Sequence, residues 1–228
     1  MYDYSNNSAA PWQNYKGSIK SIDIKDGVTS VGSWAFSQCP ILTDVSIAES
    51  VTSIGGDAFR ECSILEEITL PEGLTELGTG VFLYCSALKS VTVPEGVTKI
   101  GSDTFEFCPQ LSSITFPSSL TEIGPWALKG AYNLASITCK AATPPSLGNE
   151  AFSGVSNAFT VYVPASSVEA YKTANGWSQF ANIQPMIIAS GAYNENITWK
   201  YIDGGALVIE GTGVIPDYTQ PWSDYKQS

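Results

Sequence analysis

The chain has 228 residues, of which 43% are hydrophobic and 14% are charged, so it is long and apolar enough to bury a substantial core. Its 11 basic and 22 acidic residues leave a net charge of −11, which disfavours nucleic acids and anionic membrane surfaces as partners. The absence of histidine excludes the commonest general base, the commonest metal ligand and any nucleophile that is activated by histidine.

The central part of the sequence repeats every 23 residues. Leucine occupies positions 42, 65, 88, 111 and 134, and Ile19 extends the series by one step toward the amino terminus. Two successive units read LEEITLPEGLTELGTGVFLYCSA and LKSVTVPEGVTKIGSDTFEFCPQ. A strict period of this length indicates a solenoid of stacked coils, mainly β, and we expect six repeats over residues 19–157.

Each unit predicts a short strand, a turn and a second extended segment. The apolar residues at the first, fourth and sixth positions, such as Leu65, Ile68 and Leu70, belong on the inward side of the strand. We interpret the glycines at 27, 73 and 96 as turn residues with positive φ. The glycines at 32, 55, 78, 101 and 124 mark the corner that follows the second extended segment.

An Ala-Phe-x-x-Cys motif closes the unit. Its phenylalanine and cysteine are three residues apart, which is the spacing of one face of a helical turn. The motif predicts a buried aromatic column of Phe36, Phe59, Phe82 and Phe105. The fifth unit departs with Leu128 and Ala131, and the sixth contains an insertion at 141–145, so the solenoid is expected to end soon afterwards.

Residues 158–186 are expected to form a C-terminal cap. A strand that stops at Pro164 is followed by Ser166 or Ser167 as the N-cap of a helix. Val168, Tyr171 and Trp177 then follow a helical period. Further on, residues 187–228 contain two strand-like runs around Asp203-Gly204-Gly205, which predict a trailing β-hairpin.

Four cysteines, at 39, 62, 85 and 108, also follow the 23-residue period. In stacked coils they form a column with a spacing of about 4.8 Å, and parallel side chains keep their Cβ atoms farther apart than a disulfide requires. We expect reduced, buried thiols, including Cys139, and an occasional disulfide or redox role is the alternative. No CxxC pair supports a metal site.

The outward strand positions form a candidate partner-binding face. Its two rows contain Ser21, Asp44, Glu67 and Ser90, and Asp23, Ser46, Thr69 and Thr92. Small polar side chains suit a protein or a glycan, although any solvated sheet has the same character. A candidate acidic ladder, made of Asp26, Glu49, Glu72 and Glu95, could attract a cation or a basic protein, or could be a solvated turn.

Aromatic residues at variable positions are candidates for stacking on sugars. They are Trp34, Tyr84, Phe107 and Trp126 on the turn side and Trp12 and Trp222 near the two ends. Packing between coils is the alternative role for these rings. No carboxylate pair is singled out by a surrounding motif, so we predict no catalytic residue and no cofactor.

The pattern L-x-x-I-T-[LV]-P-x-[GS]-[VL]-T-x-I-G-x-x-[AT]-F-x-x-C resembles the BspA-like leucine-rich repeats, a class found in surface proteins of gut and oral bacteria and of some parasitic protists. The resemblance covers residues 19 to about 157. It implies a right-handed leucine-rich-repeat coil with short helical or 3-10 turns and a C-terminal capping segment. It also implies an extracellular or cell-surface location.

This resemblance implies a non-enzymatic binding or adhesion module of a secreted or surface-anchored protein. The repeat face would meet a host or bacterial protein, such as an extracellular-matrix or plasma protein. The alternative is a glycan-binding or spacer segment of a larger carbohydrate-handling surface protein.

The two ends of the chain contain related sequence motifs, MYDYSNNSAAPWQNYKGS and DYTQPWSDYKQS. In the family that the repeats resemble, a hairpin and a motif of this kind precede the first repeat. We therefore expect a segment of a longer protein, with a partial lead-in over residues 1–18 and the start of the next lead-in within residues 187–228. Such a segment has a hairpin without an array after it, which predicts head-to-tail self-association through residues 187–228.

Overall fold

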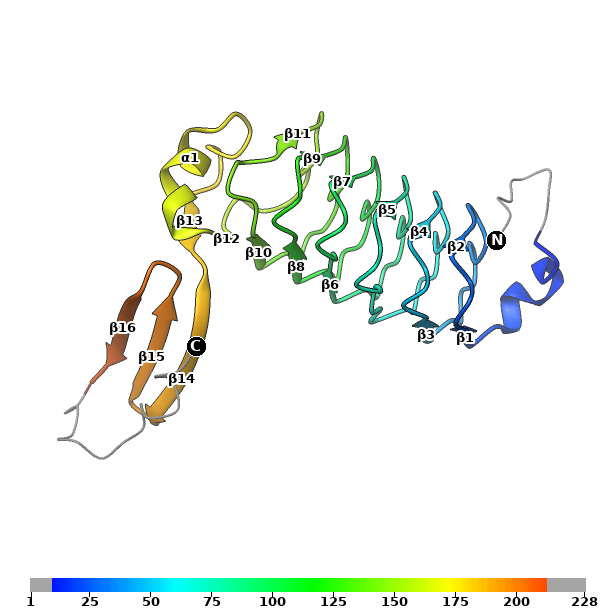
Figure 1. Ribbon diagram of the computed structural model, residues 1–228, viewed down its shortest axis with the longest axis horizontal. Coiled ribbons are helices and arrows are strands. Elements are labelled where there is room, and N and C mark those ends of the chain that lie inside the picture. Colours follow the sequence, from blue (N-terminus) through cyan, green and yellow to red (C-terminus); the bar gives the residue numbers. More distant parts are fainter. Residues whose placement is uncertain (1–9, 213–228) are drawn as a thin grey trace.

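The computed structural model describes residues 10–212, which form a solenoid of stacked coils followed by a small antiparallel sheet (Figure 1). Most coils contribute one strand to a parallel ladder along one side. These strands are β1 (Ser21–Ile24), β3 (Asp44–Ile47), β6 (Ser90–Thr92), β8 (Ser113–Phe116), β10 (Ser136–Cys139), β12 (Thr160–Val163) and β13 (Asn182–Pro185). Ser21 pairs with Asp44 and Ser90 pairs with Ser113, so the 23-residue period sets the register and the predicted solenoid is confirmed.

A second ladder of two-residue strands runs along another side of the coils. It consists of β2 (Ser30–Val31), β4 (Ser53–Ile54), β5 (Glu76–Leu77), β7 (Lys99–Ile100), β9 (Glu122–Ile123) and β11 (Ser146–Leu147). The second residue of β2, β4 and β7 points into the core and is 1% exposed. The two ladders therefore form two walls around one apolar interior.

The Ala-Phe-x-x-Cys segments form stacked turns in place of the expected helical turn. Trp34 and Gln38 have φ angles of 61° and 63°, and later coils repeat positive φ at the same places. This backbone directs alternate N–H groups at the next coil, so that Phe36 donates to the carbonyl of Ala58 at 2.8 Å. A helix would direct those donors along its own axis, so the hydrogen bonds between coils are incompatible with a helical turn here.

The described residues form helices only at the two ends of the array. A 3-10 helix, η1 (Gln13–Ser18), precedes the first coil, and η2 (Ala165–Ser167) and α1 (Val168–Thr173) belong to the cap.

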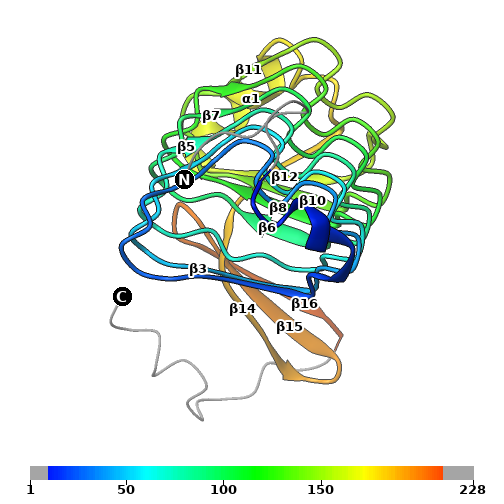
Figure 2. The ribbon, with the colours of Figure 1, turned by 90° about the vertical axis from the view of Figure 1, so that its right-hand side faces the viewer.

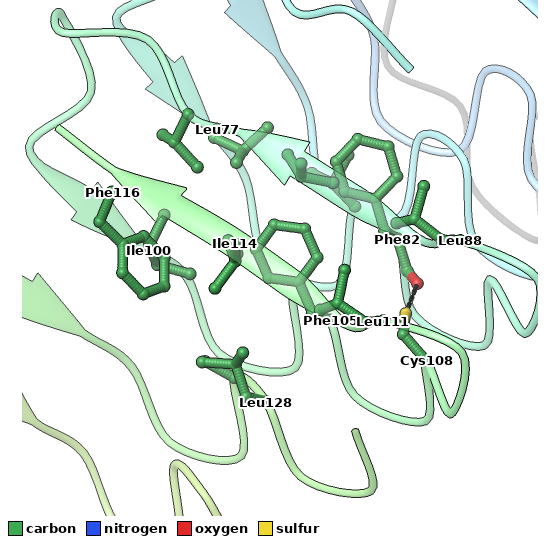
Figure 3. Packing of buried hydrophobic residues seen from close by; sticks show 14 of the residues in the cluster. Leu77, Phe82, Leu88, Ile100, Phe105, Cys108, Leu111, Ile114, Phe116 and Leu128 are labelled. Carbon is green, nitrogen blue, oxygen red and sulfur yellow. Dashed lines mark hydrogen bonds between the residues drawn. The ribbon is translucent and has the colours of Figure 1, made fainter. Parts of the chain in front are cut away.

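The predicted aromatic column is confirmed in the core. Ring centroids of Phe36, Phe59, Phe82 and Phe105 follow one another at 5.5, 5.9 and 5.6 Å, all in stacked geometry. Figure 3 shows Phe82 and Phe105 among the leucine and isoleucine side chains of the same coils. Trp12 extends the column, because it stacks on Phe36 at 5.4 Å and its indole N–H donates to a backbone carbonyl at 2.7 Å.

Close approach between coils, more than positive φ, explains the repeated glycines. Gly27 has the predicted positive φ of 92°, but Gly73 and Gly96 do not, so the prediction was wrong at these two positions. A Cβ on Gly96 would lie 2.6 Å from the carbonyl oxygen of the preceding coil, and one on Gly78 would lie 2.5 Å from a backbone nitrogen. The neighbouring coil leaves no room for a side chain there.

Each ladder is interrupted once within the described residues. The second ladder divides between β5 and β7, and the ladder of longer strands divides between β3 and β6. One sheet contains β1 and β3, and a second contains β6, β8, β10, β12 and β13. Residues 65–70 lie between them and form no strand, only an isolated bridge from Glu67 to Ser90. The expectation of one strand in every coil therefore fails at this coil.

The cap closes the far end of the core. The Tyr171 hydroxyl donates to the carbonyl of Ala141 and the Trp177 indole donates to that of Pro145, each at 2.8 Å, and both rings are fully buried. Ser167 occupies the N-cap position of α1, but its side chain makes no capping hydrogen bond. The helix ends at Thr173, so Trp177 lies beyond it, and the prediction that Trp177 belongs to the helical period was wrong.

A three-stranded antiparallel sheet follows the cap. It contains β14 (Ile187–Asn194), β15 (Ile197–Ile202) and β16 (Ala206–Gly211), and the turn at Gly204 and Gly205 has the positive φ that the predicted hairpin needs. Figure 2, which looks along the array, shows this sheet on the same side as the longer strands. The Asp203 carboxylate accepts a hydrogen bond from the Ala165 backbone at 2.8 Å, which ties the turn to the cap. Residues 3–5 of the first terminal motif, and the whole of the second motif at 217–228, lie outside the described residues.

The aromatic column predicts a large difference between two phenylalanines of neighbouring coils. Phe82→Ala should lower the free energy of unfolding by about 3–5 kcal/mol, because a fully buried ring is removed between two others. Phe107→Ala, at a partly exposed ring two residues from the column, should cost much less. Denaturant unfolding measures both, and equal losses would contradict the assignment of the core column.

Candidate interaction surface

The structure brings the predicted partner-binding face together on the outward side of the strand ladder. All eight residues of this strand face, Ser21, Asp23, Asp44, Ser46, Glu67, Thr69, Ser90 and Thr92, are exposed. The register places them in two rows, since Ser21 lies opposite Asp44 and Asp23 lies opposite Ser46. Ser113, Thr115, Ser136 and Thr138 continue the rows toward the cap. The result is one surface of small polar side chains with its acidic residues near the amino-terminal end.

The C-terminal sheet bounds the strand face at its other end. A groove forms where the two meet, and it is lined by Tyr162, Met186, Ile187 and Ile188 together with Thr138 and Lys140. Ile188 is 58% exposed, so this end of the face is apolar while the opposite end is acidic. A partner that covers the whole face would meet both kinds of surface.

The acidic ladder has a local structural role in two coils. The Glu49 carboxylate accepts the backbone N–H of Glu72 at 2.9 Å, and the Glu95 carboxylate accepts the N–H of Ser118 at 2.8 Å and the Lys140 ammonium at 3.0 Å. Burial acts to raise the pKa of Glu95, but the hydrogen bonds from Ser118 and Lys140 outweigh it and hold the pKa below its usual value. These carboxylates cap the turn of the next coil.

The ladder does not collect into a metal site. Asp26, Glu49, Glu72 and Glu95 are all exposed. Among the described residues, no group of three or more carboxylate, cysteine or histidine side chains could hold a metal ion.

The cysteines are free and buried, as predicted. Cys62, Cys85 and Cys108 each donate an S–H to a phenylalanine carbonyl of the preceding coil, at 3.3, 3.1 and 3.2 Å. Figure 3 shows this contact between Cys108 and Phe82. Burial raises the pKa of Cys108 to about 12, and it also raises the pKa values of Cys62 and Cys85, where the neighbouring cysteines add to the effect. Such thiols remain protonated and make poor nucleophiles.

On the turn side, aromatic rings and two cations of successive coils lie in one row. The Arg60 guanidinium lies 5.4 Å from the centroid of Trp34 and 5.9 Å from that of Tyr84. Tyr84 stacks on Phe107 at 5.1 Å, and the Lys129 ammonium lies 5.5 Å from Phe107. Lys129 is also 5.9 Å from the Trp126 ring. We call this row, with its six residues Trp34, Arg60, Tyr84, Phe107, Trp126 and Lys129, the cation–aromatic strip.

The strip bears on the proposed stacking of sugars. Tyr84 and Phe107 each lie between two neighbours of the strip, and both tryptophans have a cation over the ring. A sugar needs an open ring face, so these contacts favour packing between coils. Arg60 and Lys129 were not predicted to belong to this row, although they occupy the same position of the repeat, 69 residues apart.

Trp12 also packs in the core column, whereas Trp222 lies outside the described residues. No helix in the described part of the chain is long and apolar enough to cross a membrane.

Comparison with known families gives a match over most of the chain. The family model described as "BspA type Leucine rich repeat region" matches residues 13–135 and 81–191, with six copies of the repeat. A search of curated proteins found no match.

Two solved structures share this architecture. A leucine-rich cell surface protein of Faecalibacterium prausnitzii A2-165 is 28% identical, with a TM-score of 0.60, and the match covers 91% of this chain and 48% of that protein. A leucine-rich repeat protein of T. pallidum is 27% identical, with a TM-score of 0.56, and the match covers 60% of this chain and 64% of that one. The present chain thus spans about half of the first relative and less than two thirds of the second.

The raised thiol pKa values predict that stability falls in alkaline solution. In the unfolded chain the thiols ionise near their ordinary pKa of 9.0, while in the folded chain Cys108 stays protonated up to about 12. The contribution of these thiols to the free energy of unfolding is therefore fully present below pH 9.0. Above that pH the free energy of unfolding decreases by up to roughly 1.4 kcal/mol per pH unit for each thiol. Urea unfolding at about pH 8 and about pH 10 measures this slope. The double variant Cys85→Ala/Cys108→Ala should show a shallower slope, and an unchanged slope would contradict the prediction.

Proposed function

Because this chain belongs to the BspA-type leucine-rich repeat family, we propose that it is a non-enzymatic interaction module of a bacterial surface protein and binds a protein partner on its strand face. The observation that carries the proposal is the exposure of all eight outward residues in two aligned rows. Solenoids use such extended surfaces for binding. An extracellular or cell-surface location and a role in adhesion follow from the same proposal.

A protein partner fits the surface better than a glycan does. The strand face offers hydroxyl and carboxylate groups over several coils, together with the apolar groove beside Ile188. Protein interfaces combine such apolar and polar areas. The aromatic rings on which a glycan would stack contact cations or other rings in the cation–aromatic strip, and of these Tyr84 and Trp126 remain 39% and 38% exposed. Glycan binding or a spacer role is therefore the weaker alternative.

The proposal predicts that bulky charges on the strand face prevent binding. The double variant Ser90→Arg/Thr92→Arg should weaken the binding of the partner by roughly 10-fold or more, because it blocks the centre of the face. Immobilised extracellular-matrix proteins, plasma proteins and mucin glycans provide the binding assay.

The control for this experiment is Thr98→Arg/Thr121→Arg, which adds the same charge beside the second ladder, also at exposed positions. Its affinity should remain within about two-fold of the original chain. Equal losses in both variants, or binding to the glycans alone, would contradict a protein-binding strand face.

We also propose that the C-terminal sheet docks on the first coil of a second molecule. Tyr201 lies opposite Leu207 in the sheet, and Ile209 is on the same face. All three are exposed, by 43%, 51% and 38%. Figure 1 shows the first coil and this sheet at opposite ends of the array, so the contact has to be made between molecules.

Head-to-tail pairing predicts self-association that depends on this apolar face. Sedimentation at high concentration should detect dimers or longer chains, and deletion of residues 187–228 should abolish them. Leu207→Glu/Ile209→Glu should have the same effect, whereas Ser190→Glu/Thr198→Glu on the other face should not. A full chain that remains monomeric at millimolar concentration would contradict the pairing.

A further inference from the structure

The strand ladder is open at the junction between the second and third coils. At neighbouring junctions the backbone N–H of Thr43 donates to Lys20 and that of Lys89 donates to Glu66, both at 2.9 Å. The corresponding bond from the N–H of Glu66 to the Thr43 carbonyl is not made. Among the described residues, no backbone hydrogen bond joins β3 to residues 66–70. On the opposite wall β4 still pairs with β5, so at this junction the array opens on one side only.

Like charges at adjacent coils explain the opening. The first outward row contains serine at 21, 90, 113 and 136, but it contains Asp44 and Glu67 in the two coils that separate. Like charges at directly opposite positions of a sheet are destabilising. Proline is a weaker explanation for the opening. Pro71 follows the unpaired segment 65–70, but Pro117 follows β8 in the same way, and β8 still pairs with β6.

The opening exposes apolar side chains that other coils bury. Val45 and Ile47 are only partly buried, while Val91 and Val93, at the same positions of the fourth coil, are 3% and 2% exposed. Val45 and Ile68 line a groove of about 640 Å³ together with Ile64, Asp44, Glu66 and Glu67. This volume is sufficient for a few residues of a peptide.

The groove has an excess of negative charge. Glu66 forms an ion pair with Lys89. Asp44 accepts a hydrogen bond from the Thr43 hydroxyl at 2.6 Å. Among the described residues, neither Asp44 nor Glu67 forms an ion pair, and the charge of Lys89, which is paired with Glu66, also acts on Glu67. The entire chain has a net charge of −11, which adds to the attraction for a positive ligand.

The backbone along the groove also lacks partners. In a closed coil the N–H of Val93 donates to the next coil, to the carbonyl of Thr115 at 2.9 Å. Ile47 occupies the same position of the repeat, and its N–H has no such bond to residues 66–70. An exposed strand edge of this kind pairs readily with an extended chain.

We propose that this groove binds an extended, positively charged segment of the partner protein. The backbone of the segment pairs with the open edge of β3, and the aliphatic stems of its arginine or lysine side chains lie on Val45 and Ile68. Their charged ends reach Asp44 and Glu67. The inference rests on the proposed function and specifies the chemistry of the partner on the same face.

A labelled peptide tests the inference on the full chain. The probe is the extended sequence Arg-Val-Arg-Val-Arg-Val-Arg, and fluorescence anisotropy measures its binding. The variant Asp44→Ser/Glu67→Ser gives both coils the serine of the closed coils, so it should close the ladder and weaken binding by about 10-fold or more. Its unfolding midpoint should be equal or higher, which shows that it folds.

Two controls separate the groove from general charge attraction. Glu76→Ser/Glu169→Ser removes the same charge from β5 and α1, and its affinity should stay within about two-fold of the original. A probe with methyl groups on every backbone nitrogen keeps the charge but cannot donate N–H groups, and it should bind at least about 10-fold more weakly.

Equal affinity of the original chain and Asp44→Ser/Glu67→Ser would overturn the inference, and so would equal losses in the two double variants. The absence of any binding of the probe would overturn it too. The proposed function is tested by a different result, because it predicts that Ser90→Arg/Thr92→Arg prevents the binding of an intact partner protein. A partner that is lost in that variant but retained in Asp44→Ser/Glu67→Ser would leave the strand face supported and refute the groove.

Discussion

Hydrogen bonds between neighbouring coils, at a separation of about 4.8 Å, are the constraint on which the rest of this structure depends. They exclude a Cβ at Gly78 and Gly96, and they bring the phenylalanine rings to stacking distance. They also place Cys62, Cys85 and Cys108 where each S–H reaches a carbonyl of the preceding coil. The same residue types recur every 23 residues because each internal coil packs between two coils of the same kind.

Much of this fold can be predicted from the sequence, because the period is visible in single residues. The aromatic column, the buried thiols and the outward rows follow from counting positions within one repeat. The conformation of the Ala-Phe-x-x-Cys segment does not, since its turns depend on hydrogen bonds such as that from Phe36 to Ala58 in the next coil. The positive φ expected at Gly73 and Gly96 failed for the same reason.

The surface was harder to predict than the core. Asp44 and Glu67 were recognised as part of the strand face, but only the structure shows that the ladder opens between their coils. The contacts of Arg60 and Lys129 with aromatic rings were also missed, because they involve variable positions of different coils. Constraints within a repeat leave a strong signal in one sequence, and contacts between variable positions leave a weak one.

The same constraint connects the fold to the proposed binding. A closed ladder satisfies its own backbone and offers only side chains, whereas the open junction also offers N–H and C=O groups. Amide hydrogen exchange at matched repeat positions tests this account most directly. Ile47 and Glu66 at the open junction should exchange at least about 100-fold faster than Val93 and Ser112, which donate to the adjacent coil in the closed part. Equal protection at both pairs would show that the ladder is continuous and would contradict the account.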